Sequence, residues 1–273
     1  MNSLIRSGRL QRRLKYVNAG LLFLPLFFCG AFSLYAQDDA KSIMSRVYEQ
    51  DTSHDATLRA TLEITGKDGR GIKKKFIISR IGSFGNGKTI VRFTDPVELR
   101  GVKLLSVNKP GVPDQQWIYM PATERVRSIS PREQSERFAG SDFTYEDIAE
   151  HPFNNFTYQL LPAEDVIENH KTSKIMATPT ASANSQYKFI YYWVAQDVPC
   201  ILHAEMYDEG GRKIREMHAS GLRKVSGICG ARKTEMQSLL DGTKSVLTID
   251  EAHLNTGLDS AMFTPESLEK NEP

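Results

Sequence analysis

Hydrophobic and polar residues alternate in most segments of this chain after residue 57. In the stretch LRATLEIT (58–65), the apolar residues share one side: Leu58, Ala60, Leu62 and Ile64. A period of two is the pattern of a half-buried β-strand. Similar segments, bounded by Gly, Pro, Asn or Asp, continue almost to the C-terminus. They lie at residues 74–81, 88–94, 102–108, 115–121, 156–161, 187–195, 200–208, 212–219, 231–240 and 244–254.

Helical patterns are confined to the two ends of the domain. Residues 40–50 place Ile43, Met44 and Val47 on one side at helical spacing, which predicts a short amphipathic helix. Near the C-terminus, Thr264 followed by Pro265 is typical of a helix start. Ten or eleven strands with few helices predict an antiparallel sheet that curves strongly, as a meander or open barrel.

The first 36 residues carry a targeting pattern. Five basic residues precede an apolar run at 19–36, which ends in Ala36. This order predicts a secretory signal peptide over residues 1–36, and residues 37–273 are then expected to form a single exported domain. A membrane anchor is the alternative, but the run is short for a bilayer span and is interrupted by Pro25 and Gly30.

Removal of the signal peptide changes the charge and the cysteine count. The chain has 35 basic and 33 acidic residues, and cleavage leaves 30 basic residues against 33 acidic ones. A slightly acidic domain gives no electrostatic reason to expect nucleic-acid binding.

Cys200 and Cys229 would remain after cleavage, and an even number in an exported protein favours a disulfide. A regular hairpin, however, would separate them by two strand spacings, about 10 Å, whereas a disulfide needs Cα atoms within about 7 Å. We therefore expect free thiols, unless the loop 220–228 brings the two residues together.

Candidate metal ligands lie on the hairpin 200–219. Residues of equal parity pair across the turn, which places four side chains on one face of the sheet: His203, Glu205, Glu216 and His218. Two imidazoles and a carboxylate can hold zinc. A solvated polar face is the commoner origin of such a pattern, and we therefore expect no metal and no cofactor.

The segment FAGSDFTYED (138–147) combines three aromatic residues with three carboxylates. A carboxylate pair could serve acid–base chemistry. Thr144 followed by Glu146 and Asp147 is equally the pattern of a helix start, with the acids beside the positive end of the helix. We favour the helix start and expect no enzymatic activity.

Aromatic residues form two rows. One row contains Tyr187, Phe189, Tyr191 and Trp193, and the other contains Trp117 and Tyr119. Such rows bury a large area when they are covered, either as ordinary packing or as a ligand wall. A sheet curved around one short helix leaves interior volume, which favours a cavity. The predicted cavity wall consists of Leu58, Leu62, Ile64, Trp117, Tyr119, Tyr187, Phe189, Tyr191 and Trp193.

Five stretches resemble the LolA-like family of outer-membrane lipoprotein-sorting proteins. They are DPVELRG (95–101), QWIYMP (116–121), RVRSI (125–129), FAGSDFTYED (138–147) and NTGLDSAMFTP (255–265). They keep the order and spacing of the family and span residues 95–265, which is most of residues 40–273. The resemblance implies an unclosed antiparallel β-barrel of about eleven strands, short helices that plug the open side, and an apolar cavity for acyl chains.

The resemblance also implies a function. We expect a monomeric carrier in the periplasm of a Gram-negative bacterium, which moves lipid or lipoprotein acyl chains from the inner towards the outer membrane. An inner-membrane exporter of the RND/MMPL type is the further expected partner. The alternatives are a lipid-sensing regulatory or accessory module of such an exporter and, less favoured, a periplasmic hydrolase or metal enzyme.

On this interpretation residues 138–147 form a lid. Phe138, Phe143 and Tyr145 would cover the barrel mouth. The acidic residues would cap the short helix or pair with two arginines of the hairpin 116–129; the residues concerned are Asp142, Glu146, Asp147, Arg125 and Arg127. Such charge-assisted bonds contribute about 1 kcal/mol each at a partly exposed mouth.

Overall fold

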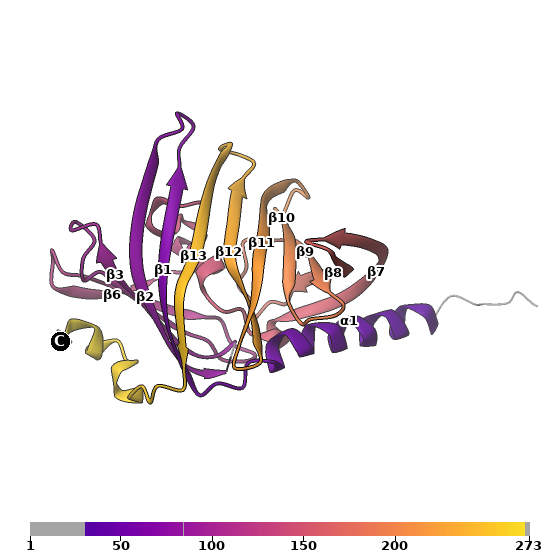
Figure 1. Ribbon diagram of the computed structural model, residues 1–273, viewed down its shortest axis with the longest axis horizontal. Coiled ribbons are helices and arrows are strands. Elements are labelled where there is room, and N and C mark those ends of the chain that lie inside the picture. Colours follow the sequence, from indigo (N-terminus) through magenta and orange to yellow (C-terminus); the bar gives the residue numbers. More distant parts are fainter. Residues whose placement is uncertain (1–30, 84, 271–273) are drawn as a thin grey trace, which may run out of the picture.

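The alternating segments become thirteen β-strands within residues 31–83 and 85–270, the part of the chain that the computed structural model describes (Figure 1). The first half contains β1 (Asp55–Thr65), β2 (Gly71–Ser83), β3 (Asn86–Asp95), β4 (Lys103–Val107), β5 (Gln115–Met120) and β6 (Arg125–Ile129). The second half contains β7 (Phe156–Ile167), β8 (His170–Pro179), β9 (Phe189–Ala195), β10 (Ile201–Tyr207), β11 (Lys213–Val225), β12 (Ile228–Ser238) and β13 (Thr243–Leu254).

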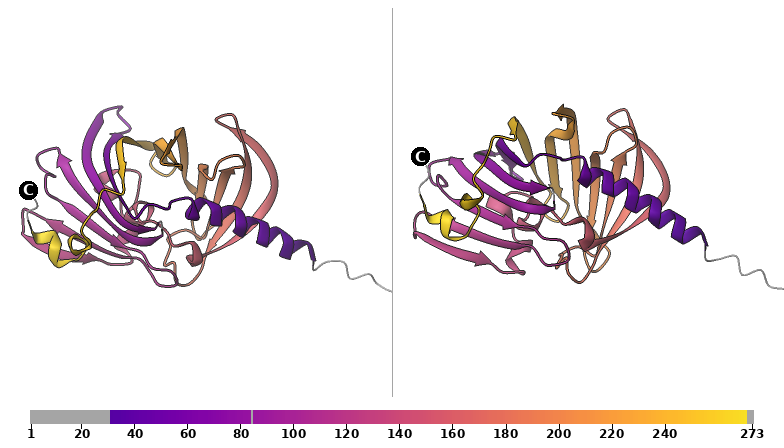
Figure 2. Two further views of the ribbon diagram at one scale, coloured as in Figure 1. Left: turned by 60° about the horizontal axis from the view of Figure 1, so that its bottom comes forward. Right: turned by 90° about the horizontal axis from the view of Figure 1, so that it is seen from below.

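All these strands belong to one antiparallel sheet. Its order is β6-β5-β4-β3-β2-β1-β13-β12-β11-β10-β9-β8-β7, so two meanders join where β1 pairs with β13. The outer strands β6 and β7 do not pair with each other, and the two halves curve towards the same side (Figure 2). The predicted unclosed antiparallel barrel is confirmed, with thirteen strands in the described residues instead of about eleven.

Helix α1 (Ala31–Glu49) runs along the open side of the curved sheet (Figure 2). Its Ala40 and Met44 are fully buried in the main core, which confirms the predicted amphipathic segment 40–50. Of the predicted signal peptide, residues 1–30 lie outside the described residues and 31–36 belong to the first turns of α1. Within the described part of the chain, no helix combines the length and hydrophobicity that a bilayer span requires.

The sheet buries side chains on both faces. The larger core lies on the concave face and includes Leu62, Phe76, Leu104 and Ile190. A smaller cluster on the convex face is covered by two C-terminal 3₁₀ helices, η4 (Ser260–Met262) and η5 (Glu266–Glu269). That cluster contains Ile90, Leu105, Tyr119, Phe263 and Leu268.

Cys200 and Cys229 form a disulfide, with Cα atoms 6.3 Å apart, so the prediction of free thiols is wrong. That prediction assumed regular hairpins. Instead, the pairing of β10 shifts between Ile201 and His203, and β11 contains Gly221 with a φ of +64°. Segment 220–228 continues β11 and turns directly into β12. These irregularities bend the strand ends and bring the two cysteines together.

Candidate functional site

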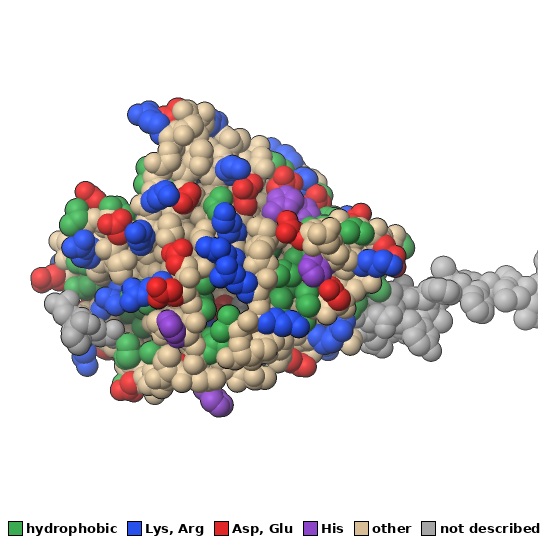
Figure 3. Space-filling view, viewed as in Figure 1, with side chains coloured by type: hydrophobic (Ala, Val, Ile, Leu, Met, Phe, Trp, Pro, Cys, Tyr) green, Lys and Arg blue, Asp and Glu red, His purple; other side chains and the backbone are tan. Residues whose placement is uncertain are grey.

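Strands β12 and β13 separate at one end and leave a cleft in the sheet. They pair only from Lys233/Thr248 to Ser238/Thr243. Beyond that point β13 stays paired with β1, and β12 stays paired with β11. A cavity of about 530 Å³ occupies this region, and a space-filling view shows a hollow here (Figure 3). We call it the β12–β13 cleft.

The walls of the β12–β13 cleft are largely apolar. They consist of Ala56, Leu58, Val225, Ile228, Ala231, Ile249, Ala252 and Leu254. Charged side chains complete the lining: Arg223, Arg232, Asp250 and Glu251, together with Asp51, Arg80 and Glu150. An apolar cavity with a few charged groups is the usual composition of a small-molecule site. Leu58 is the member of the predicted cavity wall that lines it.

Arg80 is a buried cation of this cleft. Its side chain is 7% exposed, and its guanidinium donates to Asp51 Oδ2 at 2.5 Å, to Ser53 Oγ at 2.8 Å and to Gly82 O at 2.7 Å. A buried charge needs such partners because its desolvation is costly. We call Arg80 and its partners Asp51 and Ser53 the Arg80 group. It joins the linker that follows α1 to the concave face of β2.

Glu150 is the second ionisable group beside Arg80. Its Oε1 lies 3.7 Å from Arg80 Nε, and its Oε2 accepts a hydrogen bond from Gly85 N at 3.1 Å. Burial raises the pKa of Glu150 to about 7, although the positive charge of Arg80 acts in the opposite direction. The charge at this side of the cleft therefore changes near neutral pH.

The sequence analysis missed Arg80, although a signal was present. Phe76, Ile78 and Arg80 are every second residue of β2, so their side chains all point towards the concave face. A charged residue at an inward position of a strand is unusual and is paired when it is buried. The segment KKFIISRI could have been recognised on that basis.

Other members of the predicted cavity wall lie in the packed core. Leu62 is 1% exposed in the main concave cluster, Ile64 packs against the same cluster, and neither residue lines the β12–β13 cleft. Tyr187 is 2% exposed, donates to Asp147 Oδ1 at 2.7 Å and accepts from Arg215 Nη1 at 3.2 Å. Burial raises its pKa well above the ordinary value. These residues stabilise the fold beside the cleft.

Phe189, Tyr191 and Trp193 share one face of β9, but it is the convex face; Tyr187, predicted on the same face, precedes β9 and lies in the concave core instead. Their in-between neighbours Ile190 and Val194 belong to the concave core. On the convex side Phe189 stacks on Tyr207 at a centroid distance of 4.6 Å. Alternation identified the common face but could not show which face is concave.

Trp117 and Tyr119 also lie away from the concave face. Tyr119 packs under Phe263 and Leu268, and Trp117 borders the same cluster. Trp117 lines a separate cavity of about 520 Å³ near strands β4 to β6. The C-terminal segment that covers these residues had no strand pattern by which its position could have been predicted.

The segment FAGSDFTYED folds into the concave side of the sheet. Phe138 and Phe143 are buried, and the Phe138 ring makes edge contacts with Phe76 and Tyr145. Residues 137–148 therefore fill the space above β1 to β3, and we call them the plug. Helix α2 (Tyr145–Ile148) lies within it.

Asp142 anchors the plug to β13. It is 0% exposed and accepts hydrogen bonds from Thr243 Oγ1 at 2.5 Å and Ser245 Oγ at 2.7 Å. Arg137 Nη2 lies 2.9 Å from its carboxylate. The predicted pairing with Arg125 or Arg127 is wrong: Arg127 binds Glu133 instead, at 2.7 Å. Arg137, five residues before Asp142 in the chain, is the arginine that pairs with it.

Glu146 and Asp147 tie the plug to the other half of the sheet. Glu146 accepts from Ser185 Oγ at 2.5 Å and from Gln186 N at 3.0 Å. Thr144 caps α2, because its Oγ1 accepts from Asp147 N at 3.2 Å while Asp147 accepts from Thr144 N at 2.8 Å. The predicted helix start is confirmed.

The candidate metal ligands of the hairpin 200–219 lie on the convex face, on β10 and β11. Among the described residues, one group of three can place ligand atoms within 4.8 Å of one another: His203, Glu216 and His218.

Comparisons with known proteins identify the fold. A family model described as "Uncharacterized protein" matches residues 85–270. No curated protein matches the sequence. An outer membrane lipoprotein-sorting protein domain from Vibrio parahaemolyticus has a similar structure, with a TM-score of 0.81 and 21% identity, and the match covers 86% of this chain and 100% of that chain.

Two further solved structures are similar. A DUF1329 family protein from Desulfovibrio piger matches with a TM-score of 0.81 and 24% identity over 85% of this chain and 99% of that chain. A LolA superfamily protein from Nitrosomonas europaea matches with a TM-score of 0.67 and 20% identity over 82% of this chain and 97% of that chain. The chain therefore belongs to the family whose model covers residues 85–270, and it has the fold of LolA-like lipoprotein-sorting proteins.

Proposed function

We propose that this chain is a periplasmic, non-enzymatic carrier that holds an acyl chain of a lipid or lipoprotein in the β12–β13 cleft. The observation that carries the proposal is the cleft itself, an apolar hollow of about 530 Å³ in a LolA-like sheet. Ligand cavities commonly measure roughly 300–1,000 Å³. The cleft lies where the neighbouring strands β12 and β13 separate, which gives an acyl chain a route in from the side.

Burial of hydrocarbon supplies the binding energy. Each methylene removed from water contributes about 0.8 kcal/mol, so a chain of several methylenes is retained without any specific polar contact. Leu58, Ile249 and Leu254 provide such contact area from two neighbouring strands. Arg223 and Arg232 in the lining carry positive charge towards the phosphate or carboxylate head of an amphiphile.

Release requires that the cleft can change shape. The Arg80 group is suited to this, because it connects the linker after α1, strand β2 and Glu150 beside the cavity. Protonation of Glu150 weakens its attraction to Arg80, and its pKa of about 7 places this change near neutral pH. A partner at the donor or acceptor membrane, such as an inner-membrane exporter, would act on this group.

The proposal is tested by mass spectrometry of lipids extracted from the gently purified full chain. Leu58→Asp places a charge in the cleft and is expected to lower the amount of co-purified lipid at least about tenfold, because a desolvated charge opposes acyl binding. Val166→Asp is the matched control, since Val166 is 68% exposed on β7, outside the cleft. Equal lipid content in both variants, or no lipid in the unaltered protein after exposure to phospholipid vesicles, would contradict the proposal.

A further inference from the structure

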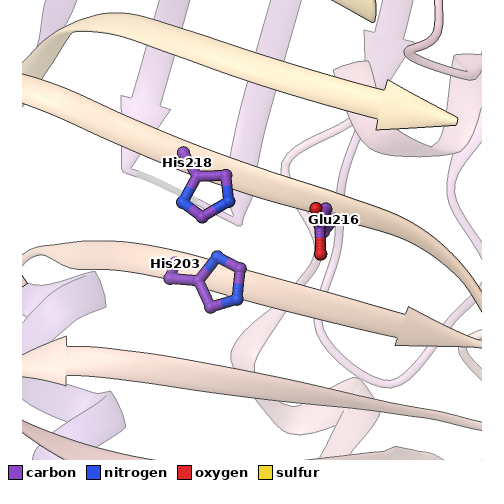
Figure 4. Close-up of side chains that lie close together, drawn as sticks. All are labelled: His203, Glu216 and His218. Carbon is purple, nitrogen blue, oxygen red and sulfur yellow. The ribbon is translucent and has the colours of Figure 1, made fainter. Parts of the chain in front are cut away.

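Two histidines and two glutamates form a square on the convex face of β10 and β11. His203 lies directly opposite His218, and Glu205 lies opposite Glu216 in the same register. The imidazole rings stack with centroids 4.2 Å apart and an interplanar angle of 25°. Figure 4 shows that His203, His218 and Glu216 come from neighbouring strands and lie close together.

His203 is held in the state that binds metal ions. It is 8% exposed and packs against the Trp193 ring at a centroid distance of 4.6 Å. Its Nδ1 lies 2.7 Å from Met217 O. A carbonyl oxygen can only accept, so Nδ1 carries a proton, and Nε2, which lies 3.9 Å from Glu205 Oε1, is the ring nitrogen left for a metal ion. Histidine ligands of metals are typically oriented by such a bond from the second ring nitrogen.

The carboxylates beside the histidines already attract a cation. Lys213 Nζ lies 2.8 Å from Glu205 Oε1 and 3.0 Å from Glu216 Oε2. Lys213 is a partly exposed side chain on a flexible stem, so its ammonium can move aside. It therefore competes with any second cation for Glu216.

We propose that His203, His218 and Glu216 bind one divalent transition-metal ion of the Zn²⁺ class. Two imidazoles and one carboxylate suit this class, whereas Ca²⁺ and Mg²⁺ prefer oxygen ligands throughout. Three protein ligands leave a fourth coordination position open. Zinc–nitrogen bonds of about 2.0–2.1 Å require the ligand atoms to move closer together than 4.8 Å, and the exposed side chain of His218 has the freedom to do so.

Bound metal would join β10 to β11 on the face opposite the plug. Because the ligands come from two strands, the ion stabilises the folded protein in proportion to its concentration and affinity. This site is independent of the acyl-binding proposal, since its residues lie outside the lining of the β12–β13 cleft.

The test is a calorimetric titration of Zn²⁺ into the full chain, with thermal unfolding followed in parallel. We expect saturable binding of one ion and a higher midpoint temperature. His218→Ala should weaken binding at least about tenfold, because it removes one of three ligands. His253→Ala is the matched control: His253 is also exposed and lies 3.8 Å from a glutamate, Glu251, but it is not part of the group of three candidate ligands found among the described residues. This variant should bind as the unaltered chain does.

A second variant tests the competition with lysine. Lys213→Met removes a positive charge 3.0 Å from Glu216 and is expected to tighten zinc binding severalfold, a change that mere loss of structure would not produce. The proposal is overturned if the unaltered chain shows no saturable binding, if His218→Ala binds as tightly as His253→Ala, or if Lys213→Met leaves the affinity unchanged or weaker.

Discussion

The plug and the β12–β13 cleft share one curved sheet, yet they are opposite in character. In the plug, the carboxylate of Asp142 is fully buried and each oxygen has a donor. In the cleft, Leu58 and Ile249 are only partly buried, and they face a cavity of about 530 Å³. The plug therefore fills the concave side near the start of β13, whereas a cavity remains near the end of that strand.

The contacts of the acidic segment account for this difference. Its aromatic residues pack in the concave core, and its acids fasten it to β13 and to residues 185–187. None of the plug residues 137–148 is among the residues that line the cleft. Glu150, whose pKa is raised to about 7 by burial, lines the cleft beside Arg80.

The largest expected effect is in the plug. Asp142→Ala should lower the free energy of unfolding by about 4 kcal/mol, because Arg137 and two hydroxyl groups lose a buried charged acceptor. Urea denaturation measures the change. Glu63→Ala is the control, since Glu63 forms an exposed pair with Lys73 and its loss should cost about 0.5 kcal/mol or less. Similar values for both variants would show that the plug is not anchored as described.

The disulfide lies at the end of β12 that lines the cleft, so its removal tests how far that region contributes to stability in comparison with the plug. Cys229 lies between Ile228 and Gly230, which line the cleft, and it closes a loop with a sequence separation of 29 residues. Reduction should lower the free energy of unfolding by about 3 kcal/mol, because the unfolded chain regains loop entropy. Urea denaturation with and without reductant measures this, and the double variant Cys200→Ser/Cys229→Ser should show no further effect of reductant.

Glu150 should make stability depend on pH. Its folded-state pKa of about 7 exceeds the ordinary value of 4.5, so between these values the folded protein keeps a proton that the unfolded chain has lost. Its contribution to stability is complete below pH 4.5 and is lost as the pH rises through about 7. From pH 5 to pH 8, the unaltered protein should lose about 2 kcal/mol more than Glu150→Gln does, measured by urea denaturation. Parallel pH profiles would contradict this role.

The smallest stability effect is expected in the cleft. Leu58→Asp should lower the free energy of unfolding by about 1 kcal/mol or less, since Leu58 is partly exposed to the cavity. Leu62→Asp, two residues along the same strand but fully packed, should prevent folding or cost several kcal/mol. If both substitutions destabilise equally, the cleft is closed around Leu58 in solution.

The sequence predicted the local features of this fold well. Alternation from Leu58 to Ile64 identified β1, and Thr144 identified the start of α2. Both depend on residues close together in the chain, where periodicity and capping chemistry are decisive.

The position of the site could not be predicted in the same way. A period of two separates two faces but does not say which is concave, so Phe189 and Tyr191 were assigned to the wrong side. The cleft arises because β12 before Lys233 and β13 after Thr248 do not pair with each other, which depends on the register of four strands. The disulfide depends on irregular pairing that no local pattern reveals.

Photo-crosslinking with a phospholipid that carries a diazirine on its acyl chain tests the central claim most directly. The full chain is loaded from vesicles, irradiated, and mapped by peptide mass spectrometry. We predict that adducts concentrate on the cleft-lining segments 56–58, 225–231 and 249–254. Adducts on the plug or on the Trp117 cavity, with none on these segments, would contradict the assignment of the β12–β13 cleft as the acyl-binding site.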